Sequence, residues 1–238
     1  MGHPAQLKSG PPVIIPHMPT LVQIYEVTSP DEARALASIG VDHIGVLVGK
    51  GKFPREQSYP AARHIFDAVP PSARKSALSL SHDIDEIGVV VEETRPDILH
   101  LGTRPESLSP SQVLALKHRF PKLKIMRTIP VRDENDIEIA RAYEGIADFL
   151  LLDTWKSGEP EIGACGLVHD WAISRRIVTE VNIPVILAGG IGPDNAAEAV
   201  RCVRPAGVDS KTKTDSPDGF AKDLQKVRAL VETVRHAG

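Results

Sequence analysis

Two consecutive glycines, Gly189 and Gly190, follow a strand-like run of apolar and β-branched residues, IPVILA at 183–188. Turn and cap residues come next (PDN, 193–195), and an alanine-rich segment typical of a helix continues to residue 203. Because glycine lacks a Cβ atom, a phosphate group can approach the backbone N–H groups at such a helix start. The run therefore predicts a phosphate site.

A single acidic residue, Asp153, ends another apolar run, FLLL at 149–152. In barrels of alternating strands and helices, functional groups lie at the carboxyl ends of the strands. The alternative is a loop aspartate that only accepts hydrogen bonds from backbone N–H groups. The position favours Asp153 as the best single catalytic candidate.

Basic residues lie in two of the predicted loops. Lys211, Thr212 and Lys213 follow the last strand-like run, and Arg55 closes the lysine-containing loop 49–55. Ammonium groups bind phosphate as point charges, and the guanidinium fork suits bidentate binding of a carboxylate. Loop cations are often merely solvated charge. If they act together, they predict a small anionic, phosphorylated substrate.

The composition argues against several classes of protein. At 238 residues, with 42% hydrophobic residues and a net charge of −3, the chain suits one globular domain without nucleic-acid or membrane partners. The histidines lack metal-ligand spacing and no dinucleotide or Walker motif is present, so we expect neither metal nor cofactor. Cys165 and Cys202 form no CxxC pair, which favours the cytoplasm. The sequence leaves the oligomeric state open.

Strand-like and helix-like segments alternate from residue 21 to the end of the chain. Strands are predicted at 21–27, 43–48, 76–80, 97–101, 124–130, 148–153, 184–188 and 207–210, and helices near 30–39, 58–69, 83–94, 109–119, 133–143, 169–181, 193–203 and 219–236. This alternation with short loops favours a closed (β/α)8 barrel, a TIM barrel, over an open doubly wound sheet. We expect residues 1–20 to be an N-terminal extension and 21–238 to form the barrel.

The stretch PVILAGGIGPDNAAEAVRCVRPAGVD, at 184–209, resembles the C-terminal quarter of phosphoribosylanthranilate isomerase, an enzyme of tryptophan biosynthesis. The LLDT sequence at 151–154 is similar to a motif of the same family. The resemblance implies an Amadori aldose–ketose rearrangement of a phosphoribosylated amine. It also implies that Asp153 is the general acid acting on the ribose ring oxygen.

The resemblance extends to residues that bind the substrate. It implies that Gly189 and Gly190 contact the phosphate and that Arg55 holds the anthranilate carboxylate, and Asp209 of the family pattern is retained. His100 lies in a predicted strand, two residues before the family's histidine position. A histidine there is usually a hydrogen-bonded core residue, but at a barrel mouth it is also a candidate for binding substrate.

Tyr25 stands where the family has the cysteine that acts as general base. An unperturbed tyrosine, with a pKa near ~10, is protonated at neutral pH and is a poor base. Nearby cations would lower this pKa, and four lysines are expected close to the same face: Lys50, Lys52, Lys211 and Lys213. Tyr25 is therefore either a base activated by lysines or a residue that only fills space.

Two further departures concern the family's glycines. Glu26 replaces the glycine that follows the cysteine, and Lys213 replaces the glycine whose N–H approaches the phosphate. An anion site with altered geometry is expected as a result. Three hypotheses follow: the family isomerase, a diverged paralogue such as a lyase or hydrolase on the same barrel, or a non-catalytic protein that binds an anion.

Overall fold

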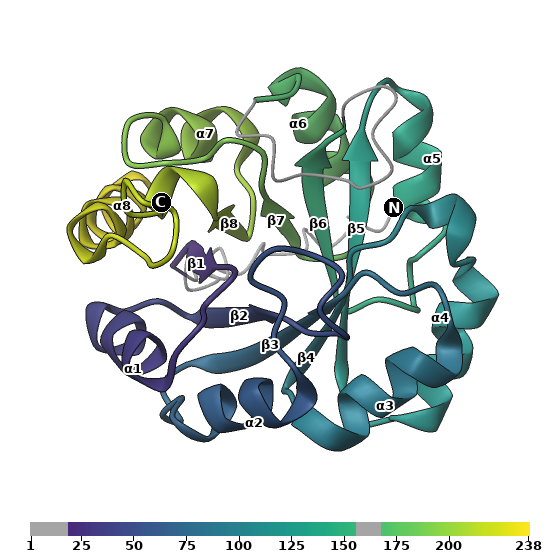
Figure 1. Ribbon diagram of the computed structural model, residues 1–238. Coiled ribbons are helices and arrows are strands. Elements are labelled where there is room, and N and C mark those ends of the chain that lie inside the picture. Colours follow the sequence, from purple (N-terminus) through teal and green to yellow (C-terminus); the bar gives the residue numbers. More distant parts are fainter. Residues whose placement is uncertain (1–18, 156–167) are drawn as a thin grey trace, which may run out of the picture.

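The computed structural model describes residues 19–155 and 168–238. Parallel strands close into a barrel in sequence order, β1 to β8, and helices surround it (Figure 1). The strands are β1 (Leu21–Ile24), β2 (His43–Leu47), β3 (Arg74–Ser79), β4 (Ile98–Leu101), β5 (Lys124–Val131), β6 (Phe149–Thr154), β7 (Val185–Leu187) and β8 (Gly207–Ser210). The predicted (β/α)8 barrel is confirmed.

The helices follow the strands one by one, and several begin with a capping side chain. They are α1 (Pro30–Ile39), α2 (Tyr59–Asp67), α3 (Ile84–Thr94), α4 (Pro110–Arg119), α5 (Asn135–Arg141), α6 (Trp171–Glu180), α7 (Ala196–Val203) and α8 (Leu224–Ala237). Ser29 caps α1 by accepting a hydrogen bond from the Glu32 N–H, and Ser109 begins α4 with a capping box. Within the described residues, no helix is long and apolar enough to cross a bilayer.

Side chains from the strands alternate between two cores. The outward-facing core packs between strands and helices and includes Val22, Leu150 and Val208, whereas the inward-facing core includes Met126 and Leu151. Successive side chains of a strand point to opposite faces, so residues two apart share a face. An inward-facing side chain near the carboxyl end of a strand therefore lies either in the packed interior of the barrel or at its mouth.

Most element boundaries differ from the sequence prediction by one to three residues, among them the end of β1, and the start of α8 differs by more. β1 ends at Ile24, so Tyr25 lies just beyond the strand. α8 begins at Leu224 instead of 219, because Asp223 caps the N–H groups of Gln225 and Lys226. The predicted extension 1–20 lies almost entirely outside the described residues.

Candidate active site

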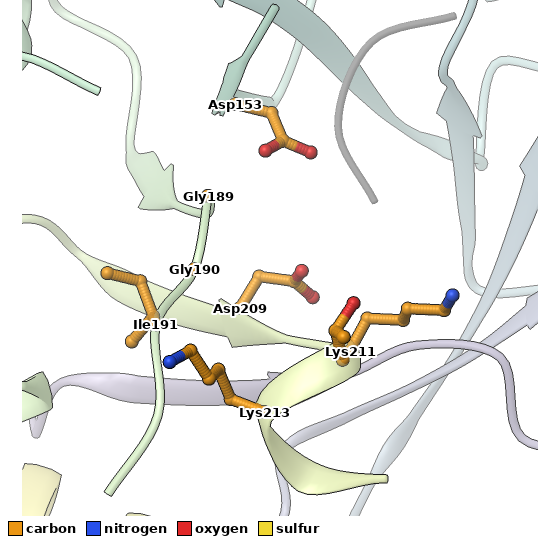
Figure 2. A pocket seen from close by; sticks show the side chains of 8 residues that line it. Asp153, Gly189, Gly190, Ile191, Asp209, Lys211 and Lys213 are labelled. Atoms are coloured by element: carbon orange, nitrogen blue, oxygen red, sulfur yellow. The ribbon is translucent and has the colours of Figure 1, made fainter. Parts of the chain in front are cut away.

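A pocket opens at the carboxyl ends of β6, β7 and β8 (Figure 2). Its lining is Asp153, Gly189, Gly190, Ile191, Asp209, Lys211, Thr212 and Lys213. Apart from Ile191, each of these residues is a candidate from the sequence. The structure therefore brings the expected acid, the glycine pair and the basic loop into one space.

The glycine pair adopts a backbone that other residues rarely adopt. Gly189 and Gly190 have φ angles of 81° and 65°. A Cβ atom on Gly189 would also collide with the Thr154 hydroxyl and lie 2.9 Å from Nδ1 of His169. Glycine at position 189 is thus required by conformation and by space.

The loop after the glycines is held in place by side-chain hydrogen bonds. The Asn195 amide donates to the Gly190 carbonyl at 3.0 Å, and its oxygen accepts the Gly192 N–H at 2.9 Å. Ser210 at the end of β8 donates to the Ile191 carbonyl at 2.7 Å. These bonds fix the loop that forms one wall of the pocket.

Two carboxyl groups, those of Asp153 and Asp209, point into the same space (Figure 2). Burial raises the pKa of Asp153 to about 7, although the Thr154 N–H, which donates to its Oδ1 at 2.7 Å, lowers it in part. Burial raises the pKa of Asp209 to about 8, and the charge on Asp153 raises it further. Near neutral pH the two groups therefore retain protons that isolated carboxyls would have lost.

The two lysines of the lining run in different directions (Figure 2). The Lys213 ammonium extends toward Ile191, on the side of the glycine pair, and lies 4.0 Å from Oδ2 of Asp194. The Lys211 ammonium extends away from the glycines and lies 3.2 Å from Oε2 of Glu26. Lys213 is therefore the lysine that faces the predicted phosphate site.

Comparison with known proteins identifies the family. A family model described as N-(5'phosphoribosyl)anthranilate (PRA) isomerase matches residues 33–233. The chain belongs to this family. The N-(5'-phosphoribosyl)anthranilate isomerase of Methanocella arvoryzae is 37% identical over 217 residues, which cover 91% of this chain and 98% of that protein.

Solved structures of this family share the fold. The phosphoribosyl anthranilate isomerase of Thermococcus kodakaraensis, 27% identical, has a TM-score of 0.73, with 91% of this chain and 99% of that chain covered. Another phosphoribosyl anthranilate isomerase was solved with reduced 1-(o-carboxyphenylamino)-1-deoxyribulose 5-phosphate. It is 20% identical, with a TM-score of 0.72 and coverage of 91% and 99% of the two chains.

Tyr25 is the residue at the family's cysteine position. Among the described residues, the pocket lining does not include it. Its side chain is 4% exposed and packs over Gly45, where a Cβ atom would collide with the ring. The hydroxyl lies 2.7 Å from Oγ of Ser76 and 2.7 Å from Nδ1 of His100. The phenol therefore sits inside the barrel, hydrogen-bonded to its neighbours.

The electrostatics correct the expectation that lysines activate Tyr25. Burial raises the tyrosine pKa well above its ordinary value, and the charge of Asp209 acts in the same direction. Lys50 instead pairs with Glu86 at 2.7 Å, and Lys211 pairs with Glu26. Because a neutral phenol is a poor proton acceptor, this placement argues against Tyr25 as the base.

His100, a candidate for substrate binding, lies in the same interior chain of polar groups. Its Nδ1 contacts Tyr25, and its Nε2 lies 2.6 Å from Oγ1 of Thr128. The residue is 3% exposed, and burial lowers its pKa to about 3. Both ring nitrogens are thus occupied, and the neutral imidazole is a hydrogen-bonded core residue, the alternative that the sequence left open.

Arg55 is bound by other parts of the chain. Its Nη1 donates to Oδ1 of Asp215 at 2.9 Å and to the Gly219 carbonyl at 3.1 Å, and its Nη2 donates to the Glu26 carbonyl at 2.6 Å. Among the described residues, the pocket lining does not include it. The guanidinium group is therefore engaged within the protein. The family resemblance instead implied a guanidinium that is free to bind the carboxylate of the substrate.

Gln23 and Lys222 were not predicted from the sequence. Their side chains form hydrogen bonds with residues of the pocket lining. The Gln23 amide donates to Oδ1 of Asp209 at 3.1 Å, across the β1–β8 pairing that places the two residues side by side. Lys222, with a fully buried side chain, donates to the Lys211 carbonyl at 3.0 Å and to Oδ1 of Asp215 at 2.6 Å. A polar residue two positions before Tyr25 signals that β1 presents polar groups inward, but it does not reveal their partners.

Proposed function

We propose that this chain catalyses the isomerisation of N-(5'-phosphoribosyl)anthranilate to 1-(o-carboxyphenylamino)-1-deoxyribulose 5-phosphate, as a step of tryptophan biosynthesis. The observation that carries the proposal is a pocket in which the Asp153 carboxyl lies near Gly189, Gly190 and Lys213. It combines a proton donor with an anion site, as an Amadori rearrangement of a phosphosugar requires. Family membership supports the same reaction.

The phosphate binds at the glycine end of the pocket in this proposal. Gly189 and Gly190 let an anion approach the backbone closely, and the Lys213 ammonium extends toward the same wall. Lys213 stands where the family has a glycine, so an ammonium group supplements the backbone contacts that the family uses. The anion is then held by charge as well as by backbone N–H groups.

Asp153 supplies the proton that opens the ribose ring. Its pKa of about 7 keeps a substantial fraction of the carboxyl protonated at neutral pH, which suits a general acid. Protonation of the ring oxygen allows the C1–O bond to break while the nitrogen lone pair forms a C1=N bond. The ring is thereby opened to a protonated Schiff base.

The anthranilate carboxylate is placed at the other end of the pocket, toward Lys211. The Lys211 ammonium extends away from the glycine pair, so the two ends of the substrate face different cations. Arg55 contributes indirectly, because it holds Glu26 and Asp215 beside Lys211 and Lys222. The described cysteine, Cys202, is a free thiol, which is consistent with the cytoplasm as the site of action.

Turnover of the purified protein on N-(5'-phosphoribosyl)anthranilate tests this function. We expect formation of the ribulose phosphate product and growth of a tryptophan auxotroph that lacks the isomerase. Asp153→Asn provides the matched control and should abolish both. A folded protein that binds phosphate but forms no product would instead be a diverged paralogue or an anion-binding protein.

A further inference from the structure

The second half of the reaction requires a base, and the family's thiol is missing at position 25. After ring opening, a proton must leave C2 of the sugar. Tyr25 is directed into the barrel interior, where its hydroxyl contacts Ser76 and His100. Among the described residues, the groups on the pocket wall are therefore the candidates to accept the proton.

Glu26, the other departure on this side, is held by cations. Its Oε2 lies 3.2 Å from the Lys211 ammonium and 3.6 Å from Nε of Arg55. Its backbone has a φ of 60°, the left-handed conformation that suits the glycine of the family. Among the described residues the pocket lining does not include Glu26, so it is a poor candidate for the base.

Asp209 is the carboxyl group that faces Asp153 across the pocket (Figure 2). One of its oxygens, Oδ1, accepts the Gln23 amide N–H. The amide is oriented in turn by His43, whose Nδ1 lies 3.0 Å from Oε1 of Gln23. Burial lowers the His43 pKa to about 4, so this ring is neutral and its Nδ1–H donates to the amide oxygen.

This chain of contacts fixes the Gln23 amide with its N–H groups toward Asp209. Hydrogen bonds donated to a carboxylate favour its charged form. They also hold the carboxyl plane in position, with Oδ1 engaged and the group directed into the pocket. Asp209 is thereby oriented as a proton acceptor.

We propose that Asp209 removes the C2 proton, so that the Asp153–Asp209 pair forms the acid and base of this chain in place of an aspartate and a cysteine. The proposal rests on the isomerase function proposed above. Two observations support it. Both carboxyl groups line one pocket, whereas the side chains of Tyr25 and Glu26 are engaged elsewhere, by Ser76 and Lys211 respectively.

The proton and electron balance closes within this pair. Asp153 begins protonated and gives its proton to the ring oxygen as the C1–O bond breaks. The pair reacts in the state in which its single proton is on Asp153, so that Asp209 is a carboxylate and takes the C2 proton. The C–H electron pair then forms the C1=C2 bond, and the C1=N π pair returns to nitrogen.

The resulting enolamine becomes the ketone by gaining a proton at C1 and losing one from the C2 hydroxyl. The two carboxyls end with their protonation states exchanged. One proton passed from Asp209 to Asp153 through solvent in the pocket restores the starting state. The raised pKa values of both groups, which arise first from burial, favour a pair that holds a proton near neutral pH.

The test compares Asp209→Asn with wild type on substrate that carries deuterium at C2. We expect turnover to fall roughly 10²–10⁴-fold, as for removal of a general base, while reduced 1-(o-carboxyphenylamino)-1-deoxyribulose 5-phosphate still binds within about threefold of wild type. A primary deuterium isotope effect should appear in the residual turnover. Asp97→Asn is the matched control, because Asp97 caps the Lys75 N–H at the opposite end of the barrel and should retain turnover.

A second variant covers the case in which Asp209→Asn does not fold. Asp209→Ala leaves space for formate. If a carboxylate is the base, added formate should raise the turnover of this variant at least about tenfold, which corresponds to about 1.4 kcal/mol in the activation free energy. If the wild type is active and Asp209→Asn is equally active, Asp209 is not the base. The same conclusion follows if Asp209→Ala folds but formate does not restore its turnover. Inactive wild type would instead refute the isomerase function on which the proposal depends.

Discussion

The two sides of the barrel mouth are built differently. On the side of β6, β7 and β8, strand ends leave a pocket lined by two carboxyls, two glycines and two lysines. On the side of β1, β3, β4 and β5, the barrel interior beneath the mouth is filled by a chain of hydrogen-bonded side chains: Ser76, Tyr25, His100 and Thr128. One side is open to a ligand, and the other is closed on itself.

This difference shows how the chain accommodates the loss of the family cysteine. Replacing a small thiol with a phenol adds volume, which Gly45 accepts, and adds a hydroxyl, which Ser76 and His100 satisfy. A buried polar group with partners costs far less than one without them. The substitution is therefore absorbed by the closed side, and the acid–base chemistry that we propose lies on the open side.

The largest effect is expected from a change on the open side. Asp153→Asn preserves the shape of the side chain and removes the proposed proton donor, so turnover should fall roughly 10²–10⁴-fold with little change in analogue binding. Steady-state kinetics and calorimetry with the reduced product analogue would measure the two quantities. Turnover that survives in this variant would mean that the pocket is not the catalytic centre.

Substitution of each lysine in turn should show which end of the pocket binds phosphate. Lys213→Ala removes the ammonium nearest the glycine wall and should weaken phosphate binding by about tenfold or more, the usual range for a charge-assisted contact. Lys211→Ala should weaken phosphate binding less, because that ammonium is paired with Glu26. Titration calorimetry with inorganic phosphate compares them, and equal losses would show that both lysines face the phosphate.

The raised carboxyl pKa values predict how stability depends on pH. An aspartate in the unfolded chain has a pKa of about 3.9, and that of Asp209 in the folded protein is about 8. Between these values the folded state binds more protons than the unfolded state, so the free energy of unfolding falls as pH rises. Asp209→Asn cannot ionise, so its loss of stability over this window should be smaller.

Melting curves at pH 4 and pH 9 check this prediction. Near pH 4 both proteins should melt at similar temperatures, and at pH 9 the variant should melt several degrees above wild type. The same substitution that removes the proposed base would then stabilise the fold. A variant that melts below wild type at pH 9 would show that Asp209 is well paired in its charged form.

The sequence predicted the open side better than the closed one. Gly189, Gly190 and Asp153 directly follow strand-like runs, and parallel strands of a barrel deliver such residues to one end. The partners of Tyr25 lie 51 and 75 residues away in the chain, and no local pattern identifies them. Arg55 has the residue type and loop expected of a ligand, but Glu26 and Asp215 from other loops engage it.

The smallest effect on turnover, and the most informative about the closed side, is expected from Tyr25→Phe. The change removes only the hydroxyl and leaves buried polar atoms of Ser76 and His100 without that partner, which should cost about 1–3 kcal/mol of stability. Because the phenol is neutral and directed away from the pocket, turnover should stay within about tenfold of wild type. Urea unfolding and steady-state kinetics on one preparation would measure both. A turnover loss of roughly 10²–10⁴-fold at unchanged stability would make Tyr25 the base after all and remove the division between the two sides of the mouth.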